Sequence, residues 1–147
     1  MTTLHICCTA AFFSLLSYAA VTDLRERRIP NAISIAMFAV AVVKTALGLQ
    51  TWQSFAAGVV LAVVLLGAYL LSRGGIGGGD VKLFLGVAAF CGMLNAAWLL
   101  GLGSAVGLLA AAVRRKKKGD LLPFAPCLWV AFVLLESCTL LKFKGVI

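Results

Sequence analysis

Residues 81–113, "VKLFLGVAAFCGMLNAAWLLGLGSAVGLLAAAV", decide how often this chain crosses a membrane. The stretch contains one lysine and no acidic residue. It is longer than the roughly 20 apolar residues that span a bilayer as one helix, yet short for two full-length helices. We expect two short spans, residues 83–94 and 96–113, that turn near Asn95. The alternative is a chain of five spans with a re-entrant segment here.

The composition of the whole chain also predicts a membrane protein. Its 147 residues are 63% hydrophobic and 12% charged, with a mean hydropathy of +1.07, whereas soluble domains average about 25% charged residues. Four more apolar runs, residues 4–21, 32–49, 54–72 and 124–141, reach or approach the spanning length. They are apolar all round, which favours helices over barrel strands. We therefore predict an all-α polytopic membrane protein, a single domain over residues 1–147 with about six transmembrane helices and short loops.

The basic residues predict the orientation of these spans. Ten of the thirteen lysines and arginines lie in three loop clusters, at residues 25–28, at Arg73 with Lys82, and at residues 114–118. Short loops rich in lysine and arginine stay on the cytoplasmic side, so these loops are expected in the cytoplasm and both termini outside. This topology and contacts with anionic lipids account for the net charge of +8 without a nucleic-acid site.

The sequence gives little support for metal or thiol chemistry. The five cysteines form no CxxC pair, which argues against a zinc ribbon, and they are expected to act as small apolar side chains. His5 is the only histidine, so a histidine-based metal centre or a Ser–His triad is excluded. We expect neither a metal ion nor a cofactor.

Two of the five acidic residues are the most informative. Asp23 ends the first span and Asp80 opens the fourth, so both are predicted at the cytoplasmic boundary of the membrane. Each alone has a structural interpretation, Asp80 as a helix N-cap and Asp23 as a boundary charge paired with Arg27. Two neighbouring carboxylates, however, do not both ionise readily. One can then hold a proton as the acid while the other acts as the base toward a peptide bond.

Glycines precede the second aspartate in "SRGGIGGGDVKL", residues 72–83. Because Gly77, Gly78 and Gly79 have no Cβ atom, they would let an extended peptide backbone approach the Asp80 carboxylate closely. We treat these three glycines as candidate substrate-binding residues.

Three motifs, in this order along the chain, resemble the type IV prepilin peptidase family. "TDLRERRIPN", residues 22–31, is similar to the segment around the family's first aspartate, "GGGDVKL", residues 77–83, to its GxGDxKL signature, and "LPFAPCLWVAF", residues 122–132, to its PFxP motif. The resemblance implies an aspartic endopeptidase of the bacterial inner membrane, with Asp23 and Asp80 as catalytic residues. It implies removal of the short basic leader from prepilins or pseudopilins at the cytoplasmic face. The implied partners are that precursor and the lipid bilayer, and a homo-oligomer is left open.

The chain departs from the larger members of that family. Those members carry paired CxxC motifs in an N-terminal cytoplasmic segment and also methylate the new pilin N-terminus. Only one span precedes Asp23 here, so we expect a short form without methyltransferase activity, similar to the minimal peptidases of tight-adherence (Flp) pilus systems. An archaellin-type precursor stays open as substrate.

Two other classes of membrane protein compete with a prepilin peptidase. In a channel or transporter component, Asp23 and Asp80 would relay ions and the glycines would form a hinge in a broken helix. Intramembrane proteases of the presenilin type share the GxGD motif, but they place both aspartates well within their spans.

Three further expectations concern packing. Gly103 and Gly107 form a small-xxx-small pair that we expect to pack against another helix of the same chain. Lys44 and Glu136 are placed at similar depths in the second and last spans, and we hypothesise an ion pair between them. The alternative is that their charged ends snorkel to the outer interface. Asn31 is expected either to cap the second helix or to form a hydrogen bond near Asp23.

Overall fold

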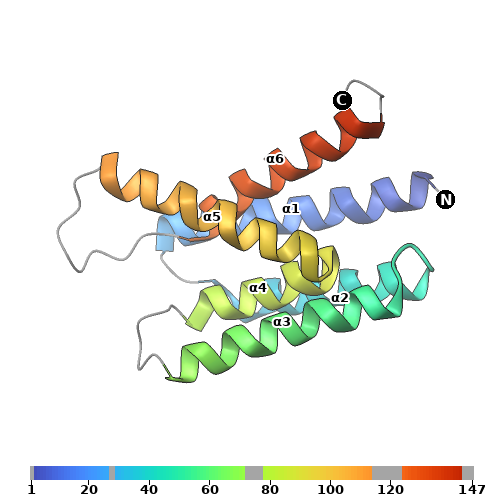
Figure 1. Ribbon diagram of the computed structural model, residues 1–147, viewed down its shortest axis with the longest axis horizontal. Coiled ribbons are helices and arrows are strands. Elements are labelled where there is room, and N and C mark those ends of the chain that lie inside the picture. The colour runs from blue at the N-terminus through green and yellow to red at the C-terminus, as the bar shows by residue number, and fades with distance from the viewer. Residues whose placement is uncertain (1, 27–28, 72–77, 114–123, 144–147) are drawn as a thin grey trace.

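The computed structural model describes residues 2–26, 29–71, 78–113 and 124–143. Within these residues it forms six helices (Figure 1): α1 (Thr2–Glu26), α2 (Asn31–Ala46), α3 (Trp52–Leu71), α4 (Gly78–Cys91), α5 (Met93–Val113) and α6 (Ala125–Phe143). Three of them, α1, α3 and α5, are long and apolar enough to cross a membrane. An all-α chain with several helices long and apolar enough to span a membrane is thereby confirmed, whereas six complete crossings stay a prediction.

Residues 81–113 form two helices as predicted, but the break between α4 and α5 lies at Gly92 rather than near Asn95. Gly92 has a φ of +77°, a left-handed conformation that glycine adopts without strain. Ser54 of α3 packs where a Cβ at this position would lie. The resulting α4 has 14 residues and a length of about 21 Å, which is less than the hydrocarbon thickness of about 30 Å.

The six helices lie roughly along one direction, with α2, α3 and α4 on one side, α1 and α6 on the other, and α5 between them (Figure 1). The C-terminal ends of α1, α3 and α5 and the N-terminal ends of α2, α4 and α6 gather toward the left of Figure 1. This alternation agrees with the predicted order of spans. Which side of the membrane that end faces stays a prediction.

The helix that carries Asp80, α4, is largely buried. Eight of the 14 residues of α4 are buried, and the helix contacts α2, α3 and α5. Glycines make two of these approaches close, because a Cβ on Gly86 would lie 2.8 Å from the Cβ of Met37 in α2, and a Cβ on Gly58 of α3 would meet the Ala88 carbonyl oxygen. Asp80 therefore lies on a helix that α2, α3 and α5 hold in place from three sides.

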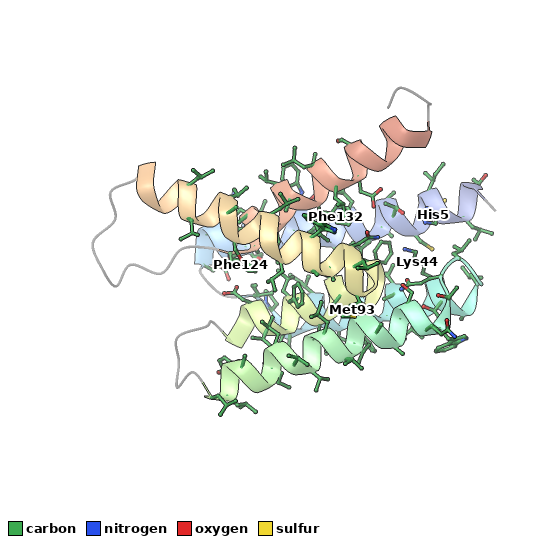
Figure 2. All side chains as sticks on the ribbon, viewed as in Figure 1. His5, Lys44, Met93, Phe124 and Phe132 are labelled. Carbon is green, nitrogen blue, oxygen red and sulfur yellow. The ribbon has the colours of Figure 1, made fainter. Side chains whose placement is uncertain are left out.

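Aromatic rings connect α4 to the other side of the bundle. The Phe12 ring of α1 stacks on Phe90 of α4 at a centroid distance of 4.0 Å and contacts Phe132 of α6 at 5.6 Å. All three side chains are buried, and Figure 2 shows Phe132 between the helices. The three helices that carry the motif residues thus share one apolar core.

The small-xxx-small pair of α5 faces α6. A Cβ on Gly103 would lie 3.2 Å from Leu128, and one on Gly107 would lie 3.7 Å from the Sγ of Cys127. The predicted packing within the chain is confirmed at both positions.

Lys44 is buried near the C-terminal end of α2, with 8% of its surface exposed (Figure 2). Its Nζ donates a hydrogen bond of 3.1 Å to the Phe90 carbonyl oxygen and lies 3.8 Å from the centroid of that residue's ring. Glu136 lies near enough for its charge to act on Lys44. The ion pair between Lys44 and Glu136 stays a hypothesis, and the carbonyl partner of Lys44 is one that sequence reasoning did not anticipate.

Candidate active site

Asp23 lies in the last turn of α1, which ends at Glu26. Its side chain is 6% exposed, so the carboxylate depends on hydrogen bonds within the protein. Oδ2 accepts one from the backbone N–H of Ala125 at an N–O distance of 3.1 Å, and the backbone N–H of Phe124 donates another. Figure 2 shows Phe124 near the end of α1. Asp23 therefore caps the N-terminus of a helix 102 residues further along the chain.

Asp80 is the third residue of α4 and is half-buried. It lies within the first turn of the helix, so it is not the N-cap residue that its simplest interpretation suggested. Burial and, to a smaller extent, the negative charge of Asp23 raise the pKa of Asp80 to about 6. Because such a charge effect requires proximity, the structure brings together the two aspartates that the sequence analysis paired.

Cys127 shows that α6 forms a third side of this site. The residue is buried near the start of α6, and the charges of both Asp23 and Asp80 act on its thiol. The C-terminal end of α1 and the N-terminal ends of α4 and α6 therefore meet around the two carboxylates.

The glycines before Asp80 have protein neighbours of their own. A Cβ on Gly78 would lie 3.1 Å from the hydroxyl of Tyr69 in α3, and a Cβ on Gly79 would lie 3.7 Å from the Ile29 side chain. Both glycines thus keep the first turn of α4 close to adjacent segments. Gly77 lies outside the described residues. Contact between these glycines and a substrate backbone stays a prediction.

The IPN part of the first motif touches the GxGDxK motif directly. Ile29 packs beside Gly79, and Asn31 Oδ1 accepts a hydrogen bond of 3.0 Å from Lys82 Nζ. Asn31 is the first residue of α2, after Pro30, and its side chain does not cap the helix. The expected capping role of Asn31 was therefore wrong, and its hydrogen-bond partner is the lysine two residues beyond Asp80. The bond links the start of α2 to the start of α4.

Sequence reasoning missed the backbone N–H groups of Phe124 and Ala125. The PFxP motif marks their place in the chain, but a main-chain donor leaves no pattern of side chains to detect. It also missed the bond that holds α6 against α1, in which Trp129 Nε1 donates to Ser17 Oγ at 2.8 Å. The predicted partner of Asp23, Arg27, lies outside the described residues.

No group of three or more His, Cys, Asp or Glu side chains is placed to hold a metal ion in the part of the chain that the structure describes.

Comparison with known proteins places this chain in a family. Residues 10–113 match the type IV leader peptidase family. The chain is 33% identical over 129 residues to the prepilin leader peptidase/N-methyltransferase of Bacillus subtilis (strain 168), a match over 84% of this chain and 52% of that protein. It thus spans about half the length of this curated relative. No solved structure matches the chain. The family match includes Asp23 and Asp80, and this chain belongs to the type IV leader peptidase family.

Proposed function

We propose that this protein is a membrane-embedded aspartic endopeptidase that removes the short basic leader peptide from prepilins or pseudopilins. Family membership supports the substrate class, and the curated relative is named as a prepilin leader peptidase. The basic clusters beside the helix ends near Asp23 and Asp80 support cleavage at the cytoplasmic face of the inner membrane.

The observation that carries this proposal is the coupling of the two aspartates. Asp23 and Asp80 come from different helices, yet the charge of Asp23 contributes to the raised pKa of Asp80, about 6. Two carboxyl groups whose charges act on each other favour a state in which one is protonated and the other ionised. That state supplies an acid and a base in the same place, as hydrolysis of a peptide bond requires.

The chemistry of such a pair follows from that state. The ionised carboxylate takes a proton from water while the water oxygen bonds to the scissile carbonyl carbon, and the protonated carboxyl group gives its proton to the carbonyl oxygen. The tetrahedral intermediate then collapses as the C–N bond breaks. The leaving nitrogen takes the proton that came from water, and a hydroxyl of the intermediate returns a proton to the second carboxylate. The pair is restored for another cycle.

A finer part of the proposal concerns the subtype. We assign peptidase activity without methyl transfer, as in the short peptidases of tight-adherence pilus systems. This part of the proposal is supported by the lack of a CxxC pair in the 147 residues.

The experiment is co-expression with a prepilin-type precursor, read as a size shift on a gel. The wild-type protein is expected to shorten the precursor, and Asp23→Asn and Asp80→Asn are each expected to abolish the shift. Glu26→Gln is the matched control, because Glu26 is an exposed carboxylate in the same last turn of α1 as Asp23. Full processing by both Asn variants would contradict the aspartic mechanism and favour an ion-relay role.

A further inference from the structure

The two carboxyl groups of the site lie in different surroundings. Asp23 accepts two backbone hydrogen bonds from Phe124 and Ala125, at the N-terminal end of α6. A helix N-terminus carries a partial positive charge, and hydrogen bonds to a carboxylate favour its ionised form. Among the described residues, the Asp80 side chain has no such donor. Burial disfavours the ionised form of Asp23, and these hydrogen bonds oppose that effect. Asp80 also lies near a helix N-terminus, in the first turn of α4, so the hydrogen bonds to Asp23 are what distinguishes the two carboxyl groups.

Contacts along α1 and α6 hold the N-terminal end of α6 in this position. Trp129 donates its indole N–H to Ser17 Oγ at 2.8 Å, and its ring lies 5.6 Å from that of Phe13. One turn further along, Phe132 contacts Phe12 at 5.6 Å. The two helices run antiparallel (Figure 1). The end of α6 is thus tied to α1, the helix that carries Asp23.

The titratable groups around the pair come from every adjoining helix. Cys127 of α6 lies near both carboxylates, and Lys82 of α4 donates its ammonium hydrogen bond to Asn31. The Tyr69 hydroxyl of α3 lies beside Gly78. Burial and the charge of Asp23 raise the pKa of Asp80 to about 6, so Asp80 keeps its proton to a higher pH than an ordinary aspartate does.

We infer that the first turn of α6 divides the catalytic roles, holding Asp23 as the ionised base and leaving Asp80 as the protonated acid. The backbone N–H groups of Phe124 and Ala125 are positioning groups in this scheme, because they act through Asp23. The inference rests on the proposed peptidase function and gives the PFxP motif a physical task.

The assignment makes each proton transfer specific. The Asp23 carboxylate takes a proton from water as the water oxygen bonds to the carbonyl carbon, and Asp80 gives its proton to the carbonyl oxygen. When the C–N bond breaks, Asp23 gives the proton it took to the leaving nitrogen, and Asp80 recovers one from a hydroxyl of the intermediate. Asp23 thus returns to the carboxylate that α6 stabilises.

The direct test is the order in which the two carboxyl groups titrate. The chain has three aspartates, so carbon-13 NMR of the detergent-solubilised protein with labelled aspartate carboxyl groups gives three signals, assigned with Asp23→Asn and Asp80→Asn. Asp23 is expected to ionise about one pH unit or more below Asp80, the size of effect that hydrogen bonds to a charged group produce. Ionisation of Asp80 first, or indistinguishable midpoints, would overturn the assignment. The result is independent of cleavage, so a wild type that leaves the precursor intact refutes the proposed function alone.

Ala125→Pro tests the positioning role of α6. Ala125 is the first residue of α6, where proline suits the helix, and proline has no N–H to donate to Asp23. The midpoint of Asp23 is expected to rise by about one pH unit, and the acidic limb of the cleavage profile is expected to move with it. Ala125→Gly keeps the N–H and is the control, expected to leave both midpoints unchanged. A shift confined to the alkaline limb of the cleavage profile would identify Asp80 as the ionised base. If Ala125→Pro does not fold, the order in which Asp23 and Asp80 titrate in the wild type decides between the two assignments.

Discussion

The polar groups at the two ends of α4 have different surroundings. At the C-terminal end, each of the last four carbonyl oxygens accepts a hydrogen bond: the backbone of Gly92 donates to Ala88 at 2.9 Å, Gln50 to Ala89 at 3.1 Å, Lys44 to Phe90 at 3.1 Å and Asn95 to Cys91 at 3.3 Å. At the N-terminal end, Asp80 is half-buried beside a second carboxylate and has a raised pKa, about 6.

The difference shows how a short helix can end inside a membrane protein. Hydrocarbon offers no water to the free carbonyl groups of a helix end, so a helix of about 21 Å needs donors from its neighbours. Lys44 and Gln50 come from α2 and the turn after it, and they supply two of them. Hydrogen bonds therefore stabilise the C-terminal end of α4, whereas the N-terminal end carries a carboxyl group that can titrate.

Asp80→Asn is expected to give the largest effect. Loss of the acidic proton should lower the cleavage rate about 10³-fold or more. The unfolding temperature in detergent should not fall at pH 7, because the amide is isosteric and removes a charge that burial disfavours. Cleavage assays and thermal unfolding of the same sample check both parts. A large loss of stability would show that Asp80 stabilises the fold, as Lys44 is expected to do. The proposed difference between the two ends of α4 would then be wrong.

The pH dependence of stability sharpens the same contrast. The folded-state pKa of Asp80, about 6, lies above its ordinary value of 3.8, so the folded protein binds more protons than the unfolded chain between these values. The contribution of Asp80 to stability therefore falls as pH rises from about 4 to 6, and then stays constant. The penalty above pH 6 is about 3 kcal/mol at most, because solvent screens the partly exposed carboxyl group and lowers it.

Unfolding of the wild type and of Asp80→Asn, compared at several pH values, measures that penalty. The two proteins should converge below about pH 4, and Asp80→Asn should be the more stable above pH 6. A stability difference that does not change with pH would mean that Asp80 titrates at its ordinary value.

Much of the fold and of the site was predictable from the sequence, and the predictions that failed did so for physical reasons. Apolar runs and basic clusters predict the helices, because burial in lipid and charge placement depend on local sequence. The motifs predict that Asp23 and Asp80 belong together. The break at Gly92 was missed because the groups that stabilise it come from other segments: Ser54 packs against Gly92, and Gln50 donates a hydrogen bond to the carbonyl oxygen of Ala89.

The partners of Asp23 and Asn31 were missed for a related reason. The donors to Asp23 are backbone N–H groups of Phe124 and Ala125, and nothing in a side-chain pattern specifies which carboxylate a helix end will meet. Asn31 pairs with Lys82 because α2 and α4 start side by side, which becomes evident only from the packing of the helices.

Lys44→Met addresses the stable end of α4. It removes the donor from the Phe90 carbonyl group, and a buried acceptor without a partner costs about 1–3 kcal/mol. The unfolding temperature in detergent should fall, while cleavage per folded molecule should stay close to that of the wild type. Lys44→Arg retains a donor and should recover part of the loss. Wild-type stability of Lys44→Met would show that the hydrogen bond contributes nothing to the end of α4.

A double-mutant cycle adds the hypothesised ion pair to this comparison. If Lys44 and Glu136 interact, the effects of Lys44→Met and Glu136→Gln on stability should not add. If the two effects add in the double variant, Lys44 and Glu136 do not form an ion pair, and the Phe90 carbonyl group is the stabilising partner of Lys44.

The smallest effect is expected at the surface of the active end. Lys82 and Asn31 are exposed, so their hydrogen bond should contribute less than about 1 kcal/mol to stability. Asn31→Ala and Lys82→Met should each have a slight effect on unfolding, and their double-mutant cycle should show a small positive coupling. Strictly additive effects would mean that the contact is incidental. Because Lys82 lies two residues beyond Asp80, a drop in cleavage larger than the loss of stability would show that the link between α2 and α4 positions the first turn of α4 for catalysis.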